Sequence, residues 1–298
     1  MSTLWQQQRA AHRKTAEPLA ARMRPRCLED FVGQEHILGS GKMLRRMLEA
    51  DRITSLIFYG PPGTGKTSLA EVIAQHTRRY FVRAHAAGIG VKQIRDILDS
   101  ALKRLEDDGR RTILFLDEIH RFNRAQQDVL LRDVEGGIIS LIGATTENPF
   151  FAINSPLVSR SQIFSFEPLN EQEIERVIRC AVSDQQRGLG QLSIQITDEA
   201  IAHWASVSDG DARRALTALE IAVLSSSGDA KSQTDGPGPS AVLDSESARY
   251  DGECFAPNLE PVDIDLAVAE ESIQRKAIVY DGTGDDHYDA ASALIKAM

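Results

Sequence analysis

The stretch Gly60–Thr67 has residue types and a spacing that suit phosphate binding. It reads Gly-Pro-Pro-Gly-Thr-Gly-Lys-Thr and fills every fixed position of the pattern G-x-x-x-x-G-K-[ST]. Glycines let the main chain turn so that its N–H groups face phosphate oxygens. Lys66 is placed to reach the β- and γ-phosphates, and the Thr67 hydroxyl is a ligand for Mg²⁺. The sequence therefore predicts a nucleoside triphosphate site. Its predicted residues are Gly60, Pro61, Pro62, Gly63, Thr64, Gly65, Lys66, Thr67 and Ser68.

Two carboxylates, Asp117 and Glu118, directly follow the apolar run Ile113–Leu116. Asp117 suits Mg²⁺, which it would hold through water molecules, and Glu118 suits the orientation and polarisation of an attacking water. An acidic pair at a strand end is a weak signal by itself, because any buried strand can end in acidic residues. Downstream of an intact phosphate loop, the pair predicts hydrolysis rather than binding alone.

The elements that must position these residues alternate between strands and helices. The phosphate loop lies between a predicted strand and a predicted helix over 67–74, which argues against a chance Gly/Pro turn. Apolar spacing predicts a further helix over 91–105. Such alternation predicts an α/β fold with a parallel sheet covered on both faces, and the loop at the carboxyl ends of the strands. The predicted strands are Ser55–Tyr59, Tyr80–Ala84, Arg111–Leu116, Ile138–Gly143 and Gln162–Phe166.

From Asn170 onward the pattern becomes helical. Asn170 and Thr197 are suitable helix caps, and a third helix begins beside Gly210. The residues from Ser225 to Pro261 are rich in Ser, Gly, Pro and Asp, which predicts a disordered surface insertion rather than an ordered loop. The predicted helices are Glu171–Gln186, Asp198–Ser206, Asp211–Leu224, Asp263–Lys276 and Ala290–Met298.

These patterns divide the chain into five parts. A basic arm comes first, then the α/β core, a helical lid, the acidic insertion, and finally the rest of the lid with the start of a further helical domain. The parts are residues 1–22, 23–169, 170–224, 225–261 and 262–298.

The charge and the cysteines limit the class of protein. The net charge is −9, but most of it lies between Asp229 and Asp265, whereas the first 26 residues are basic. This distribution fits DNA contact and equally fits a solvated basic face. No apolar run approaches the roughly 18 residues of a membrane span, and the N-terminus lacks a signal-peptide core. The isolated cysteines have no metal-ligand spacing and predict reduced thiols in a cytosol; they are Cys27, Cys180 and Cys254.

Several strings together resemble a known family. The phosphate loop, Asp117–His120, Ser159-Arg160 and Gly210–Arg214 look like an AAA+ ATPase of the clamp-loader type. Longer strings resemble the replication-associated recombination protein A family and its eukaryotic relative, the Werner-helicase-interacting ATPase. These strings are Asp117–Asn123, Ala125–Asp128, Ile142–Pro149, Tyr280-Asp281 and His287–Asp289. The resemblance implies an AAA+ core with a five-stranded parallel sheet, followed by a small helical lid.

The resemblance also implies roles for residues outside the loop. Val32 and Gly33 match the segment that surrounds the adenine. Thr146 matches the sensor that helps to place the water, with Asn148 as a weaker candidate. Arg160 matches the arginine finger that reaches the γ-phosphate of a neighbouring subunit, and Arg213 matches the lid arginine that contacts the γ-phosphate. For each arginine alone, a surface salt bridge is the alternative. The implied catalytic set is Lys66, Glu118, Thr146, Arg160 and Arg213.

The function implied by the resemblance is a Mg²⁺-dependent, DNA-stimulated ATPase that maintains replication forks and acts in recombination and repair. The implied cofactors are ATP and Mg²⁺. The implied partners are single-stranded, gapped or fork-like DNA and replisome proteins such as single-stranded-DNA-binding protein, in the cytoplasm at the nucleoid. His120 and Cys27 have no second metal ligand nearby and are interpreted as structural residues.

Two departures from the family pattern limit these expectations. Leu131–Glu135 lacks the Pro-His pair that usually precedes the glutamate, which affects DNA or subunit contacts rather than nucleotide chemistry. Family members also continue into a helical domain that forms tetramers. This sequence holds only the first residues of that domain. We therefore do not expect it to form tetramers, nor to hydrolyse ATP with an arginine finger from a neighbouring subunit.

Two other functions remain open at this point. A clamp-loader subunit or a branch-migration motor would work by similar mechanics, but the four-cysteine module of the first and the winged helix of the second are not found in the sequence. A non-hydrolysing adaptor would use ATP only to hold its shape. Intact Lys66, Asp117, Glu118 and Arg160 argue against the adaptor, whereas the missing C-terminal helical domain argues for it.

Overall fold

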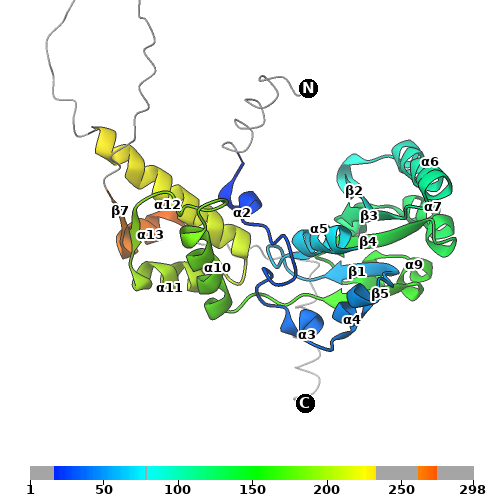
Figure 1. The fold of residues 1–298 in the computed structure, drawn as a ribbon, viewed down its shortest axis with the longest axis horizontal. Helices are drawn as coiled ribbons and strands as arrows, with labels where there is room; N and C mark the ends of the chain where they lie inside the picture. The colour runs from blue at the N-terminus through cyan, green and yellow to red at the C-terminus, as the bar shows by residue number, and fades with distance from the viewer. Residues whose placement is uncertain (1–16, 78, 233–260, 274–298) are drawn as a thin grey trace, which may run out of the picture. The chain divides into compact units, whose positions relative to one another are not determined.

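The computed structural model describes residues 17–77, 79–232 and 261–273 (Figure 1). They form two compact units, one running from Arg24 to Asn170 and the other holding the described residues up to Met23 together with those from Glu171. Several predictions fall outside the described residues. They concern the basic arm before residue 17, the insertion over 233–260, Cys254, and the motifs and helix after residue 273.

A five-stranded parallel sheet forms the centre of the first unit, as predicted (Figure 1). Its strand order is β2-β3-β4-β1-β5, so β1 lies between β4 and β5. Because all strands run parallel, their carboxyl ends meet at one edge of the sheet, where ligands bind in folds of this kind. The strands are β1 (Ser55–Tyr59), β2 (Tyr80–His85), β3 (Thr112–Asp117), β4 (Ile139–Thr145) and β5 (Ser161–Ser165).

Helices cover both faces of this sheet. Ile113 and Phe115 of β3 point to one apolar cluster, and Leu114 and Leu116 point to the other, because successive strand residues face opposite sides. The first cluster includes residues of α3 (Glu35–Leu38), α4 (Met43–Glu49) and α5 (Lys66–His76). The second includes residues of α6 (Val91–Asp108), α7 (Arg124–Glu135) and α9 (Ser155–Ser159). Short segments complete the unit: η1 (Ala86–Gly88), η2 (Ile119–Arg121) and α8 (Pro149–Ala152).

A buried arginine, Arg79, ties the amino ends of the strands together. Its guanidinium donates to the Ile53 carbonyl at 2.9 Å, to the Ser140 hydroxyl at 2.8 Å, and to the main chain and carboxylate of Asp51 at 3.1 Å. The Arg79 side chain is only 4% exposed. Segments before β1, before β2 and in β4 are thereby joined at the edge opposite the phosphate loop.

We expect Arg79→Met to lower the free energy of unfolding by about 1–3 kcal/mol, because the buried Ser140 hydroxyl oxygen loses its guanidinium donor and the Ile53 carbonyl keeps only its bond from Ser140. Urea denaturation of the variant measures this loss. Arg52→Met is the matched control, since Arg52 is exposed and nearby. Equal denaturation midpoints for the two variants would show that Arg79 does not stabilise the sheet.

The second unit is mainly helical. Trp204 of α11 (Asp198–Val207) is fully buried, and its indole N–H donates to the Ala269 carbonyl at 3.2 Å and the Ser272 hydroxyl at 3.0 Å. The predicted cap Thr197 accepts from the Ala200 N–H, and Asp211 accepts from the N–H groups of Arg213 and Arg214 in the first turn of α12 (Ala212–Ser232). The helices are α2 (Leu19–Arg22), α10 (Glu171–Ser183), α11 (Asp198–Val207), α12 (Ala212–Ser232) and α13 (Leu266–Ser272).

Helix α10 ends at Ser183 rather than Gln186, and two other boundaries in this unit differ more from the prediction. Helix α12 continues to Ser232 instead of ending at Leu224, because extending an existing helix costs less than starting one. The predicted helix from Asp263 is wrong at its start. Val262–Ile264 is a strand, β7, which pairs in parallel with β6 (Ile194–Ile196), and Asp265 then caps α13. Strands β6 and β7 are only three residues long each and lie far apart in the sequence. Their apolar patterns are too short to predict that they pair.

Candidate nucleotide-binding site

The loop Gly60–Thr67 has a main-chain conformation that needs its glycines. Gly60, Gly63 and Gly65 have φ values of 145°, 72° and 97°, which residues with a side chain rarely adopt. A Cβ at Gly60 would lie 2.3 Å from the Phe166 carbonyl oxygen. The loop runs from the carboxyl end of β1 into the N-terminus of α5, which begins at Lys66. Its N–H groups and the helix dipole can therefore attract phosphate.

We expect Gly60→Ala to weaken ATP binding about tenfold or more, because a backbone strain of about 1–3 kcal/mol must be relieved by moving the loop. Equilibrium binding of a fluorescent ATP analogue measures the change. Gly88→Ala is the matched control, since no atom lies within 4 Å of a Cβ at Gly88. Unchanged affinity in the folded Gly60 variant would contradict the assignment of this loop.

Lys66 lies on the inner side of the loop. It is 9% exposed, and its ammonium donates to the Gly60 carbonyl at 2.7 Å and to the Pro61 carbonyl. The Thr64 hydroxyl donates to the same Pro61 carbonyl at 2.9 Å and closes the turn. The loop is therefore held in a curved form with a positive charge inside it.

The segment predicted to surround the adenine is fastened beside this loop. The ring of Phe31 packs on Gly65, where a Cβ would lie 2.6 Å from its Cζ atom. Gln34 donates to the Glu167 carbonyl at 2.7 Å and accepts from its N–H at 3.0 Å, which ties the segment to the chain after β5. Val32 and Gly33 lie between these anchors and are half-buried. Their contact with a base stays a prediction.

Asp117 and Glu118 lie at the same sheet edge, at the end of β3. The Asp117 carboxylate is 3.6 Å from Arg83 and 3.9 Å from His85, both on β2. Arg83 also contacts Glu71 of α5 at 3.2 Å, and Glu71 contacts Arg24 at 3.1 Å. The sequence does not reveal this chain of charges, because its members are far apart along the chain and only the fold brings them together.

Glu118 has a left-handed main chain, with φ 54°, and its side chain is 43% exposed. The carboxylate can therefore contact water at the sheet edge, as a base that activates water must. A nearby cation, Arg121, lies 4.0 Å from it.

The end of β4 meets the phosphate loop. The Gly60 N–H donates to the Thr145 carbonyl at 3.2 Å. The predicted sensor Thr146 follows Thr145 and is exposed. Asn148 instead caps α8 and accepts from the Phe150 N–H at 3.1 Å. The Asn148 side chain is therefore occupied in capping a helix. Thr146 stays the predicted sensor.

The two predicted arginines are held by α9 and α12. Arg160 caps α9, is 43% exposed, and pairs with Glu135 of α7 at 2.7 Å. Arg213 belongs to the helical unit, at the exposed start of α12. Arg160 is thus paired at the surface of the first unit, and Arg213 belongs to the second unit, so both roles stay predictions.

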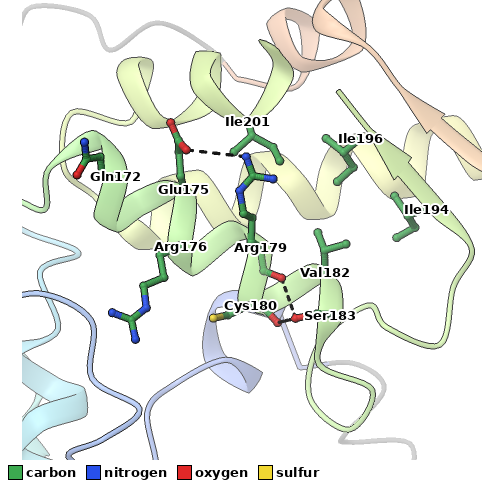
Figure 2. A pocket seen from close by; sticks show the side chains of 10 residues that line it. All are labelled: Gln172, Glu175, Arg176, Arg179, Cys180, Val182, Ser183, Ile194, Ile196 and Ile201. Atoms are coloured by element: carbon green, nitrogen blue, oxygen red, sulfur yellow. Dashed lines mark hydrogen bonds and ion pairs between the residues drawn. The ribbon is translucent and has the colours of Figure 1, made fainter. Parts of the chain in front are cut away.

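Two of the hollows among the described residues are lined by side chains that the sequence did not predict as site residues. One, of about 410 Å³, lies beside Arg83 and His85, next to the partners of Asp117. The other, of about 640 Å³, lies in the helical unit between α10, β6 and α11 (Figure 2). Three isoleucines and the charged face of α10 line it, and Arg179 there pairs with Asp198 at 2.8 Å.

Comparison with known families decides the assignment. Residues 56–169 match the model of the ATPase family associated with various cellular activities (AAA), and residues 190–298 match the AAA C-terminal domain. The chain belongs to the AAA family of ATPases. This AAA chain is similar to replication-associated recombination protein A of Escherichia coli K12, with 41% identity over 95% of this chain and 57% of that protein. The same-named protein of Bacillus subtilis is 42% identical over 95% and 59%.

A eukaryotic relative of this AAA chain is the ATPase WRNIP1 of Dictyostelium discoideum, with 35% identity over 96% of the chain and 31% of that protein. The predicted family resemblance is confirmed. The chain spans a little over half the length of the bacterial relatives that it matches.

The AAA fold is confirmed by solved structures. The Thermotoga maritima RuvB Holliday junction branch migration motor matches with a TM-score of 0.61 and 23% identity, covering 84% of this chain and 72% of that one. At this identity the match supports the fold alone. In the part of the chain that the structure describes, no helix has the length and apolar character needed to cross a membrane.

Proposed function

We propose that this chain binds and hydrolyses ATP with Mg²⁺ and acts on DNA in replication-associated recombination and repair. One observation carries the proposal: the glycine-built phosphate loop, Asp117 and Glu118 all lie at the carboxyl edge of one parallel sheet. The similarity to replication-associated recombination proteins supports the cellular role. The cytoplasm at the nucleoid is the corresponding location.

The residues divide the chemistry between them. The loop N–H groups and Lys66 bind the β- and γ-phosphates, and Lys66 exchanges its carbonyl partners for phosphate oxygens when ATP enters. Glu118, exposed at the strand end, orients the attacking water and accepts its proton. Thr146 helps to place that water, and Val32 and Gly33 hold the adenine.

The chemistry of the donors fits Mg²⁺. The Thr67 hydroxyl and the Asp117 carboxylate would supply oxygen ligands, which Mg²⁺ prefers. The ion usually completes its coordination with water molecules and substrate phosphate oxygens. Mg²⁺ would neutralise charge that develops on the phosphates.

Two arginines are proposed to complete the site. Arg160 is the finger offered to a neighbouring subunit, and its exposure at the end of α9 supports this role. Arg213 is the lid arginine that contacts the γ-phosphate of its own chain. Turnover would then depend on a homo-oligomer, with single-stranded or gapped DNA and single-stranded-DNA-binding protein as further partners.

Comparing ATP hydrolysis with single-stranded, duplex and gapped DNA tests this proposal when the solution mass is measured in parallel. We expect gapped or single-stranded DNA to increase the rate of an oligomeric sample. Failure of every DNA to stimulate a chain proven to be oligomeric would contradict the DNA-linked function. ATP binding without any turnover would favour the adaptor.

A further inference from the structure

His120 is a buried, titratable side chain that the proposed mechanism leaves without a task. It is 5% exposed and lies in η2, two residues after Glu118. Its Nδ1 atom is 2.9 Å from the Thr145 hydroxyl at the end of β4. Its Nε2 atom is 3.7 Å from the carboxylate of Glu147. His120 thus joins the turn after the catalytic strand β3 to the turn that carries Thr146.

The Thr145 hydroxyl is the centre of this connection. It lies 3.0 Å from the Glu147 N–H and 3.2 Å from the Glu147 carbonyl. A hydroxyl has one proton to donate and two lone pairs. All three contacts are satisfied when it donates to the Glu147 carbonyl and accepts from the Glu147 N–H and from His120 Nδ1–H. This network assigns the Nδ1 proton to His120.

A second contact fastens the same turn to β4. Ile119 is fully buried, and a Cβ at Gly143 would lie only 2.9 Å from its Cδ1 atom. The two residues that follow Glu118 therefore both contact β4, Ile119 at Gly143 and His120 at Thr145. Glu118 itself has the left-handed main chain that leads from β3 into this turn. Its position depends on where the turn is held.

We propose that His120 is a positioning residue for hydrolysis, which acts through Thr145 to fix the Thr146 turn relative to Glu118. The proposal rests on the proposed function, in which Glu118 and Thr146 place the attacking water. Small displacements of such groups cost up to about 10²-fold in rate. Loss of the His120–Thr145 hydrogen bond should therefore slow the chemical step more than it weakens ATP binding.

Two amide substitutions separate the contacts of the imidazole. In His120→Asn the amide lies near the place of Nδ1 and can still bond the Thr145 hydroxyl. In His120→Gln it lies near the place of Nε2, toward Glu147. We expect the Gln variant to lower kcat for ATP about 10- to 100-fold with KM unchanged, and the Asn variant to restore most of the rate. Thr145→Val should match the Gln variant, and Thr145→Ser should match the unaltered chain.

His76→Asn is the control for the loss of an imidazole, because His76 is exposed at the end of α5. Equal kcat in all His120 variants would overturn the proposal. So would better rescue by Gln than by Asn, since the contact with Thr145 would then not matter. A parallel loss of ATP binding and turnover would also overturn it, as this result marks a purely structural residue.

Hydrogen exchange keeps this test independent of turnover. In His120→Gln, the amides of residues 145–148 should exchange faster, those of the phosphate loop should not change, and His120→Asn should restore protection. If the unaltered chain does not hydrolyse ATP, the proposed function fails, and the exchange result alone decides on His120. Unchanged exchange over 145–148 would then overturn the positioning role.

Discussion

Replacing Glu118 by glutamine is expected to reduce phosphate release about 10²–10⁴-fold while ATP binding is retained. The amide has the shape of the carboxylate but cannot accept a proton from the attacking water. The phosphate loop that carries the binding energy lies at the end of β1, whereas Glu118 lies at the end of β3. Binding and chemistry should therefore separate in this variant.

The measurement pairs equilibrium binding of a fluorescent ATP analogue with phosphate release at saturating ATP. Glu106→Gln is the control, since Glu106 is exposed on α6 and is not a predicted site residue. A Glu118 variant that releases phosphate as fast as this control would remove Glu118 from the catalytic set.

Replacing Arg160 by alanine is expected to lower turnover of an oligomer by about 10³–10⁵-fold, the range measured for arginine fingers in other nucleotide hydrolases. The side chain is half-exposed at the end of α9, and its ion pair with Glu135 is at the surface. Such a pair contributes little to stability, so the fold should tolerate the change. Glu135→Gln removes the partner of Arg160 and should leave turnover nearly unchanged.

Mixing the two inactive variants tests whether Arg160 acts between subunits. Sites with an intact Glu118 would receive a finger from a neighbour with an intact Arg160, so part of the turnover should return. Each variant alone should stay inactive. If the mixture gains no activity although mixed oligomers form, Arg160 does not complete the site of a neighbouring subunit.

The sequence was informative where function and fold use local patterns. The phosphate loop predicted a strand before Gly60 and a helix after it, and the structure has both. The apolar runs predicted five strands, and all five pair in one parallel sheet. Asp117 lies at the end of its strand, as its neighbours Leu114 and Leu116 indicated. Each of these features is set by residues close together in the chain.

The interactions that the sequence did not reveal join distant segments. Arg79 bonds residues before β1 and in β4, and nothing in its own surroundings distinguishes it from an exposed arginine. The pairing of β6 with β7 was missed for the same reason. His120 looked like a structural residue because its partner, Thr145, lies on another strand. These contacts can be recognised only once the fold has brought the two residues together.

The most direct test of the central claim is ATP turnover by the chain over a range of protein concentrations, with gapped DNA present. We predict that ATP is converted to ADP and phosphate, that the specific rate rises with concentration as subunits meet, and that Lys66→Ala abolishes both binding and turnover. ATP that binds but is recovered unchanged at every protein concentration would contradict hydrolysis at this site.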